Sequence, residues 1–294
     1  PRGQGDAMNR FLVTDIGELV TCGGGVKRGA AMKNAGAVKD GAFFVADGVI
    51  QAVGSREELE KRYRGEARFS CNGALVTPGF VDSHTHALYG GERSEEFSMR
   101  LRGASYMSVM ESGGGIAATV AATRAATEEE LVRRGKEHLA RMLAFGVTTA
   151  EVKSGYGLDT ETELKQLSAV KKLGEIQPVE LVPTYMGAHA VPAGTTAEAY
   201  IERCVNEILP KIAESGLAEF ADIFCEEGVF SLSQSEKYLL KAGSLGFRLK
   251  LHADEMVSLG GAGLGARLGA VSADHLLKIG KEDIARLAKS DTIA

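Results

Sequence analysis

Two histidines separated by one residue carry the strongest chemical signal in the sequence. His84 and His86 follow an apolar run, residues 74–82, that is typical of a buried strand. Side chains repeat every second residue along an extended chain, so both imidazoles are expected to point the same way. Two imidazoles on one side of a strand end supply two ligands of a metal site. The alternative is a polar strand end in which the histidines occur by chance.

Three further histidines also come just after predicted strands. They are His189, His252 and His275, and with the first pair they make five of the six histidines in the chain. Ligands bind at the carboxyl ends of the strands in parallel α/β folds. We therefore predict that these five side chains line one site. His138 lies in the middle of a predicted helix and is expected to belong to the scaffold.

Carboxylates accompany these histidines. Glu255 follows His252 by three residues and could act as a general acid or base beside a metal-held water. The alternative for Glu255 is an ordinary solvated carboxylate. Asp254 is expected to cap a loop or orient a ligand. Asp82 and Asp274 each precede a strand-end histidine and are expected to make structural hydrogen bonds.

Three other residues could contact a ligand. Lys153 ends a predicted strand and could be carboxylated to bridge two metals, or could pair with a carboxylate; we favour the pair. Tyr156, between two glycines, is expected to reach over the pocket. Arg93 could bind a carboxylate through two parallel hydrogen bonds, although a lone arginine is more often a surface residue.

These residues must be positioned by alternating strands and helices, which start near residue 74. Thr127, Thr160 and Ser233 each begin a Ser/Thr-x-x-Glu pattern that opens a predicted helix. Repeated strand–helix units imply a parallel sheet, either open and doubly wound or closed into an eight-stranded barrel. In a barrel, the chain would stop before closure and be a fragment. The expected strands are residues 74–82, 147–152, 179–185, 221–225, 247–252 and 270–275, and a seventh starts at 291.

The first quarter of the chain has a different pattern. Short β-prone runs fill residues 8–73, and Asp47-Gly48 between two of them predicts a hairpin. We expect a small, incomplete β domain there and a second domain over residues 74–294. Residues 1–7 have no apolar period and are interpreted as a leader or a cloning remnant.

Composition narrows the class of protein. The chain of 294 residues is 44% hydrophobic and 25% charged, as is usual for a globular protein. Its formal charge is 34 − 39 = −5, which argues against nucleic acid or an anionic membrane as a partner. Four cysteines without a C-x-x-C pair, and no secretory signal or membrane span, predict a cytoplasmic protein. A Gly-x-Ser-x-Gly motif is missing, which disfavours a serine hydrolase.

Residues 77–86, TPGFVDSHTH, resemble the first barrel strand of the amidohydrolase superfamily. Within it, further segments resemble the imidazolonepropionase family, and the resemblance extends from Met8 onward. These segments are residues 90–93 (GGER), 103–107 (GASYM), 112–116 (SGGGI), 153–158 (KSGYGL), 184–190 (TYMGAHA) and 252–255 (HADE).

The resemblance implies a distorted (β/α)8 barrel, truncated after the start of strand 7, with a small β-sandwich built from both chain ends. The implied reaction hydrolyses the cyclic amide C–N bond of 4-imidazolone-5-propanoate, giving N-formimidoyl-L-glutamate in histidine degradation. The small anionic substrate would be the main partner, and the enzyme would be a homodimer.

The resemblance also implies roles for individual residues. His84, His86 and His252 would bind one Zn or Fe ion, with a fourth ligand, an Asp on the eighth strand, beyond residue 294. Glu255 and His275 would orient and deprotonate the metal-held water. Glu255 would also contact the substrate, as would Arg93, Tyr106, Tyr156 and His189, and the His189 ring would donate to the developing oxyanion.

Three alternatives remain open at this point. A nucleobase deaminase of the same superfamily has similar histidines, but Arg93 with Tyr156 favours an anionic substrate. A non-catalytic fragment is the second. A binuclear cyclic amidase that uses a carboxylated Lys153 is the third, and it is disfavoured because Lys153 falls on the second strand.

Overall fold

The computed structural model describes residues 9–104 and 114–294. It consists of two compact units, Pro1–Gly79 and Phe80–Ala294, which are described separately. The segment interpreted as a leader and the substrate-contact candidate Tyr106 lie outside the described residues, as do Ser112 and Gly113 of the SGGGI motif.

Unit 1 contains two small sheets around separate apolar clusters. The predicted hairpin is confirmed: β4 and β5 pair antiparallel, and Asp47 and Gly48 both have positive φ, as the tight turn requires. The larger sheet has the order β5-β4-β1-β6 and the smaller one β3-β2-β7. The elements are β1 (Arg10–Thr14), β2 (Glu18–Val20), η2 (Gly29–Lys33), β3 (Ala37–Val38), β4 (Gly41–Ala46), β5 (Val49–Ser55), α1 (Arg56–Arg62), β6 (Ala67–Ser70) and β7 (Leu75–Val76).

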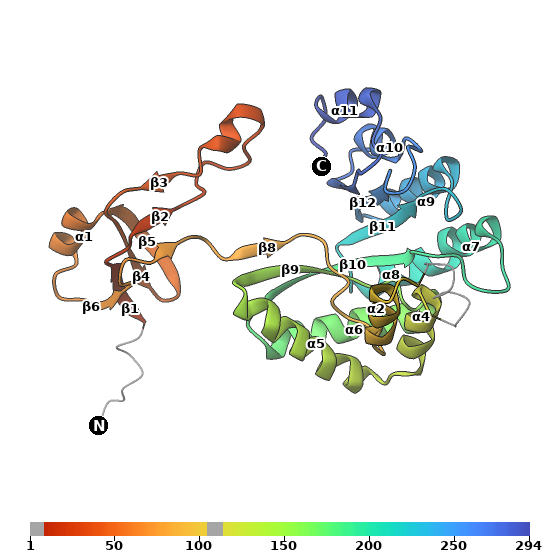
Figure 1. The fold of residues 1–294 in the computed structure, drawn as a ribbon, viewed down its shortest axis with the longest axis horizontal. Coiled ribbons are helices and arrows are strands. Elements are labelled where there is room, and N and C mark those ends of the chain that lie inside the picture. The colour runs from red at the N-terminus through yellow and green to blue at the C-terminus, as the bar shows by residue number, and fades with distance from the viewer. Residues whose placement is uncertain (1–8, 105–113) are drawn as a thin grey trace. The chain divides into compact units, whose positions relative to one another are not determined.

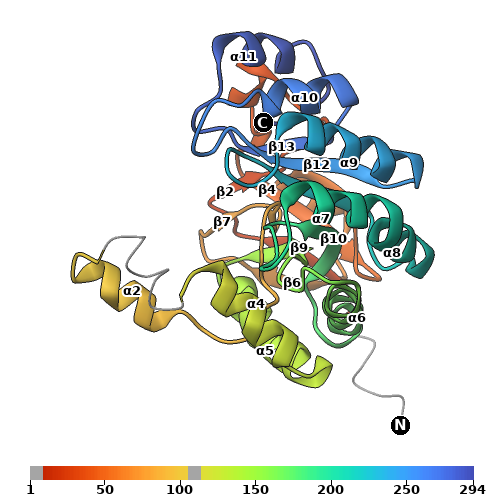
Figure 2. The ribbon, with the colours of Figure 1, turned by 90° about the vertical axis from the view of Figure 1, so that its right-hand side faces the viewer.

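Unit 2 is a parallel sheet with helices on its outer face, as the strand–helix alternation predicts (Figures 1 and 2). Its order, β13-β12-β11-β10-β9-β8, follows the chain without reversal. In a doubly wound sheet the order of the strands reverses near the middle of the sheet. The unbroken order seen here, together with the curl of the sheet, therefore favours the barrel type. The strands are β8 (Phe80–Asp82), β9 (Val147–Lys153), β10 (Glu180–Ala188), β11 (Phe220–Cys225), β12 (Arg248–Ala253) and β13 (Ser272–His275).

Helices follow most of these strands. The helical segment Ala197–Ser215 is continuous but contains one π-helical stretch, η3. Within the part of the chain that the structure describes, no helix has the length and apolar character to cross a membrane. The helical elements of unit 2 are α2 (Ser94–Leu101), α4 (Ile116–Ala125), α5 (Glu128–Ala144), α6 (Thr160–Ile176), α7 (Ala197–Arg203), η3 (Cys204–Ile208), α8 (Leu209–Ser215), α9 (Leu232–Ser244), α10 (Gly261–Leu268) and α11 (Lys281–Leu287).

The prediction of a single strand over residues 74–82 is wrong. The structure has two short strands there, because β7 pairs with β2 in unit 1 whereas β8 pairs with β9 in unit 2. Pro78 lies between them and has no N–H to donate to a ladder, which favours the break. The expected strand start near residue 291 is present as a parallel bridge between Ile293 and Ser272.

Helix caps agree with the sequence at one site and differ at two. Thr127 forms the predicted capping box with Glu130. Helix α6 begins at Thr160 as expected, but Asp159 caps it, because the Glu163 side chain binds loop amides instead. The cap predicted for α9, Ser233, lies two residues after the residue that caps this helix in the structure. Ser231 caps α9, and Gln234 completes the box, since this pair also satisfies the Ser-x-x-Gln pattern.

The two-residue period of the strands separates two environments. On β9, Ala150 and Val152 pack against the apolar faces of α5 and α6. The alternate residues Glu151 and Lys153 face the inside of the curl and are also buried. The same alternation on the neighbouring strands directs charged residues and histidines to the inner face. The inner face therefore carries the chemistry, and the outer face carries the hydrophobic core.

The cap correction is testable. Replacing Ser231 by Ala removes the hydroxyl that accepts from the Gln234 amide, and we expect a loss of about 1 kcal/mol in the free energy of unfolding. Ser233→Ala is the matched control and should change it by less than about 0.5 kcal/mol. Urea denaturation of both variants measures the difference. A larger loss for Ser233→Ala would contradict the assignment.

Candidate metal centre and active site

The His84-Thr85-His86 segment is held against β9 by its middle residue. The Thr85 hydroxyl donates to the Glu151 carbonyl at 2.5 Å, and the Thr85 carbonyl accepts from the Lys153 amide at 3.0 Å. These two bonds fix the backbone that carries the two imidazoles.

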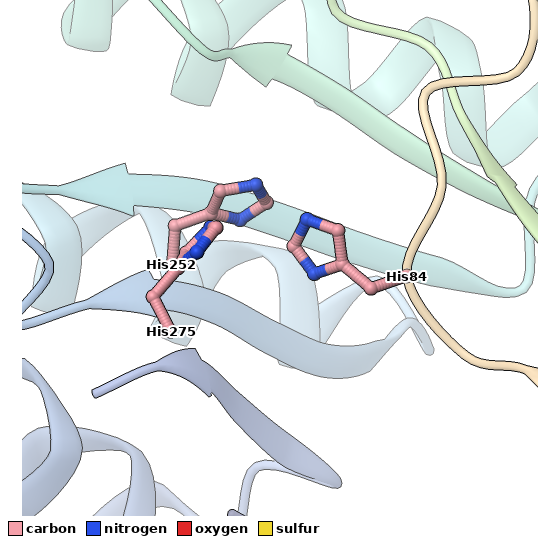
Figure 3. Close-up of side chains that lie close together, drawn as sticks. All are labelled: His84, His252 and His275. Atoms are coloured by element: carbon pink, nitrogen blue, oxygen red, sulfur yellow. The ribbon is translucent and has the colours of Figure 1, made fainter. Parts of the chain in front are cut away.

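The five predicted histidines meet at the carboxyl ends of the parallel strands. The His84 ring centroid lies 4.5 Å from that of His252 and 4.9 Å from that of His275. Figure 3 shows these three rings turned toward one another, His84 from the segment after β8 and the others from β12 and β13. His86 stacks on His189 with centroids 4.7 Å apart. The predicted convergence is therefore present in the structure.

His252 joins two candidate cation sites. Its potential ligand atoms lie within 4.8 Å of those of His84 and His275, and also of those of His86 and His189. The ring centroids of His84 and His86 are 5.5 Å apart, and these two histidines fall in different triplets. The set predicted by resemblance, His84 with His86 and His252, stays a prediction.

The chemistry of these nitrogens fits a cation. The Nε2 atoms of His86 and His252 face each other at 3.4 Å, and the buried Nδ1 of His86 has no hydrogen-bond partner among the described residues. Imidazole nitrogens are ligands that suit Zn and Fe. Two further triplets include carboxylates: Glu151 and Asp274 with His84, and Asp222 and Asp274 with His252. These carboxylates lie against lysine ammonium groups, so the histidine nitrogens are the better cation site.

Burial keeps several of these imidazoles neutral. Burial and the neighbouring His252 lower the pKa of His189 to about 4. Burial, reinforced by His189 and His252, holds the pKa of His86 well below its ordinary value. Burial also lowers the pKa of His275. Because a metal ligand must offer a lone pair, rings that stay neutral at pH 7 are prepared for a cation.

His189 corrects one expectation from the sequence. Its Nδ1 lies 3.0 Å from the Gly155 carbonyl oxygen, which can only accept, so the Nδ1–H donates. The neutral ring then offers a lone pair at Nε2, and it does not donate to an oxyanion from that atom. The sequence alone could not show this, since Gly155 and His189 lie on different loops.

Glu255 and His275 lie at the rim of the histidine cluster. Glu255 Oε2 is 3.8 Å from His275 Nε2, and both side chains are about one-third exposed. His275 has a positive φ of 75°, a strained conformation for this residue type that is typical of functional sites.

Two buried carboxylates hold the loop that carries Glu255. Glu226 accepts from the backbone amides of Glu255, Met256 and Val257 at 2.9–3.2 Å. Asp254 accepts from three amides farther along, which confirms its predicted capping role. Residues 254–262 are thereby fixed by charge-assisted hydrogen bonds from both sides.

Lys153 is fully buried and pairs with carboxylates, as predicted. Its Nζ lies 2.6 Å from Asp222 Oδ2, 2.9 Å from Glu151 Oε1 and 3.7 Å from Asp274 Oδ2. A carbamate at this nitrogen would add a negative charge among three carboxylates, so the geometry argues against a carboxylated lysine. Lys250 supplies a second ammonium, 2.9 Å from Glu151.

Sequence reasoning missed Asp222, Glu151 and Lys250. Glu151 and Lys250 each lie two residues before another ionisable residue on the same strand, Lys153 and His252, and Asp222 is the only charged residue of β11. Charged residues on one face of a predicted strand are the sequence signal that could have found them. Asp274, expected to be structural, accepts a hydrogen bond from the His84 ring at 2.7 Å.

The two candidate substrate contacts outside the histidine cluster lie in the loops after β8 and β9. Tyr156 is half-buried, with its ring 5.6 Å from His86 and 5.3 Å from His189. Burial raises the pKa of Tyr156, and the positive charge of Arg93 partly opposes this rise. The Nε and Nη2 of Arg93 both lie within 2.8 Å of Glu96 Oε2, which orients the guanidinium.

Solved structures with the same fold include deaminases and a hydrolase. A 5-methylcytosine deaminase from Klebsiella pneumoniae aligns with a TM-score of 0.65 at 13% identity, over 96% of this chain and 64% of that one. A triazine hydrolase from Arthrobacter aurescens aligns at 0.61, over 97% and 64%. A zinc-bound adenosine deaminase from Xanthomonas campestris aligns at 0.55, over 96% and 61%. The chain thus spans less than two thirds of these structures, and it has the amidohydrolase fold.

Sequence comparison defines the family more narrowly, although no family model matches the chain. An imidazolonepropionase of Bacillus velezensis is 51% identical over 286 residues, 96% of this chain and 68% of that protein. The Clostridium tetani enzyme of the same name is 49% identical, over 96% and 69%. The chain belongs to the imidazolonepropionase family, and the family and hydrolase class predicted from the motifs are confirmed.

Neutral buried histidines predict a pH dependence of stability. Unfolded histidines take up a proton near pH 6.5, whereas folded His189 does so only near pH 4. Between these values the unfolded chain binds more protons, so the free energy of unfolding of the metal-free protein falls as pH falls from 7.5 to 5.5. Urea denaturation across this range measures the slope. His189→Gln should flatten it, and equal slopes in the two proteins would refute the assignment.

The hydrogen bonds that Glu226 accepts from residues 255–257 predict a local effect on stability and amide exchange. Glu226→Gln places an amide nitrogen against backbone N–H groups, and we expect a loss of about 1–3 kcal/mol in unfolding free energy and faster amide exchange at residues 255–257. The exposed neighbour variant Glu227→Gln is the matched control. Hydrogen exchange read by mass spectrometry tests both; unchanged protection in Glu226→Gln would show that the carboxylate does not hold the loop.

Proposed function

We propose that this chain carries the hydrolytic site for 4-imidazolone-5-propanoate, which opens the cyclic amide C–N bond to give N-formimidoyl-L-glutamate. The proposal depends on one observation. Five histidines and Glu255 meet at one edge of a parallel sheet in a chain about half identical to imidazolonepropionases. The six parallel strands would be part of a distorted (β/α)8 barrel, and the enzyme would act in the cytoplasm as a homodimer.

One Zn or Fe ion is the proposed cofactor, held by His84, His86 and His252. When bound, such an ion acts as a Lewis acid and lowers the pKa of the water that it holds. The rings of His84 and His252 receive their orientation from Asp274 and Asp222, which accept from their Nδ1 atoms. The remaining chemistry is proton transfer and substrate positioning by the side chains of the chain itself.

Glu255 and His275 are proposed to move the proton. Hydrolysis adds the oxygen of water to the carbonyl carbon, breaks the C–N bond and leaves a proton on the departing nitrogen. The carboxylate and the imidazole lie 3.8 Å apart at the open side of the histidine cluster. This position suits a group that takes a proton from water and delivers it to the leaving nitrogen.

Arg93, Tyr156 and His189 are the proposed substrate contacts within the described residues, and Tyr106, which lies outside them, is a fourth proposed contact. The positive charge of Arg93, which acts on Tyr156, suits the anionic propanoate arm of the proposed substrate. His189 offers a lone pair at Nε2, so it would accept from an N–H of the substrate ring. Such contacts orient the scissile bond and can supply several kcal/mol of the rate.

A nucleobase deaminase is the second candidate, since neighbours with this fold include such enzymes. We expect loss of imidazolone absorbance and no ammonia release from guanine or cytosine. Glu255→Gln should lower kcat at least about 100-fold while metal content is retained, because it removes the proton carrier and no proposed ligand. Glu227→Gln is the control. Ammonia release without imidazolone turnover would favour the deaminase, and an unaffected kcat would remove Glu255 from the reaction.

A further inference from the structure

Next to the histidine cluster lies a set of buried charges, and its two lysines, Lys153 and Lys250, have no role in the proposed reaction. Lys153 and Asp222 are fully buried, and Glu151 and Lys250 are nearly so. Burying an ionised group is costly unless a partner compensates it. The three carboxylates of Glu151, Asp222 and Asp274 face two ammonium groups, so the set has one net negative charge on the side of the histidines.

Asp222 connects this set to His252 through its two oxygens. Oδ2 accepts from Lys153 Nζ at 2.6 Å, and Oδ1 lies 3.1 Å from His252 Nδ1. A carboxylate beside an ammonium group can only accept hydrogen bonds, so when the His252 ring carries a single proton, that proton is on Nδ1. The lone pair is then on Nε2, which faces the Nε2 of His86 at 3.4 Å.

We infer that Lys153 is a positioning residue for the metal centre: by holding Asp222 it sets the ring orientation and tautomer of His252, so that Nε2 is directed to the cation. The inference rests on the proposed metal site and extends it to a residue that touches neither metal nor substrate. A partner that fixes the other nitrogen of a ligating histidine typically changes metal affinity 10–100-fold.

A second carboxylate repeats the arrangement. Asp274 Oδ2 lies 2.7 Å from His84 Nδ1 and 3.7 Å from Lys153 Nζ. One ammonium therefore lies between the two aspartates that hold two histidines from well-separated parts of the described sheet, one after β8 and one on β12. Without it, two buried carboxylates would repel each other, and the preferred positions of both rings would be lost.

Lys250 provides the matched control. It is also buried in this set, 2.9 Å from Glu151 Oε1 and 3.8 Å from Asp274 Oδ2, and it donates to the Ser83 carbonyl. No contact joins it to Asp222. Lys250→Met therefore removes an ammonium from the same set without touching the pair that holds His252.

The first test concerns the tautomer in the metal-free wild-type chain. Long-range ¹H–¹⁵N correlation with ¹⁵N-histidine, assigned through His252→Gln, reports which nitrogen of His252 carries the proton. We expect the Nδ1–H form in the wild type, and a loss of this preference in Asp222→Asn. An Nε2–H ring in the wild type would overturn the inference, even if Asp222→Asn does not fold.

The second test concerns affinity for Zn²⁺, measured by competition with a chromophoric chelator. Lys153→Met should weaken binding 10–100-fold, as should Asp222→Asn. Lys250→Met should weaken it less, because Lys250 contacts Asp274 but not the Asp222 that holds His252. Circular dichroism verifies that each variant is folded. Wild-type affinity in Lys153→Met, or an equal loss in Lys250→Met, would overturn the inference. Neither test needs turnover, so a chain that passes both and fails to hydrolyse the imidazolone would refute only the proposed function.

Discussion

The buried ion pair between Lys153 and Asp222 is the interaction on which the site depends. Burial alone lowers the pKa of Lys153, but Asp222 and Glu151 outweigh it and raise the pKa above the ordinary value. Likewise burial raises the pKa of Asp222, yet His252 and Lys153 hold it well below its usual range. Each charge is stable in the interior because its charged partners compensate for its burial. The inner face of the curled sheet can therefore be charged while its outer face packs as a core.

This constraint joins residues that are distant in the chain. His84 and Asp274 are 190 positions apart and come within 2.7 Å. Parallel strands bring their carboxyl ends to one edge, so each strand contributes one or two side chains to the same small volume. Buried carboxylates then fix those side chains: Glu226 holds the loop of Glu255, and Glu163 accepts from the amides of Gly155 and Gly157 around Tyr156. The orientation of the site thus comes from buried acceptors rather than from the rings themselves.

Much of the fold followed from local patterns. The strand–helix alternation, the Asp47-Gly48 hairpin and the Thr127 cap depend on neighbours within a few residues, and all are present. The errors have a common cause. Residues 74–82 contain two strands because different sheets pair with them, and α9 begins at Ser231 because two overlapping patterns satisfy a cap equally well. Sequence periodicity does not distinguish such alternatives when the deciding contact is distant.

The sequence by itself determined that five histidines end strands, and that Glu255 follows one of them, because a strand end is a local property of the chain. Only the tertiary structure decided which rings are neighbours, that Asp222 orients His252, and that Gly155 makes His189 an acceptor. The physical reason is that a hydrogen bond or an ion pair needs a distance of about 3 Å. Curvature and register of the sheet set that distance between strands, and neither quantity is encoded in the spacing of residues along a single strand.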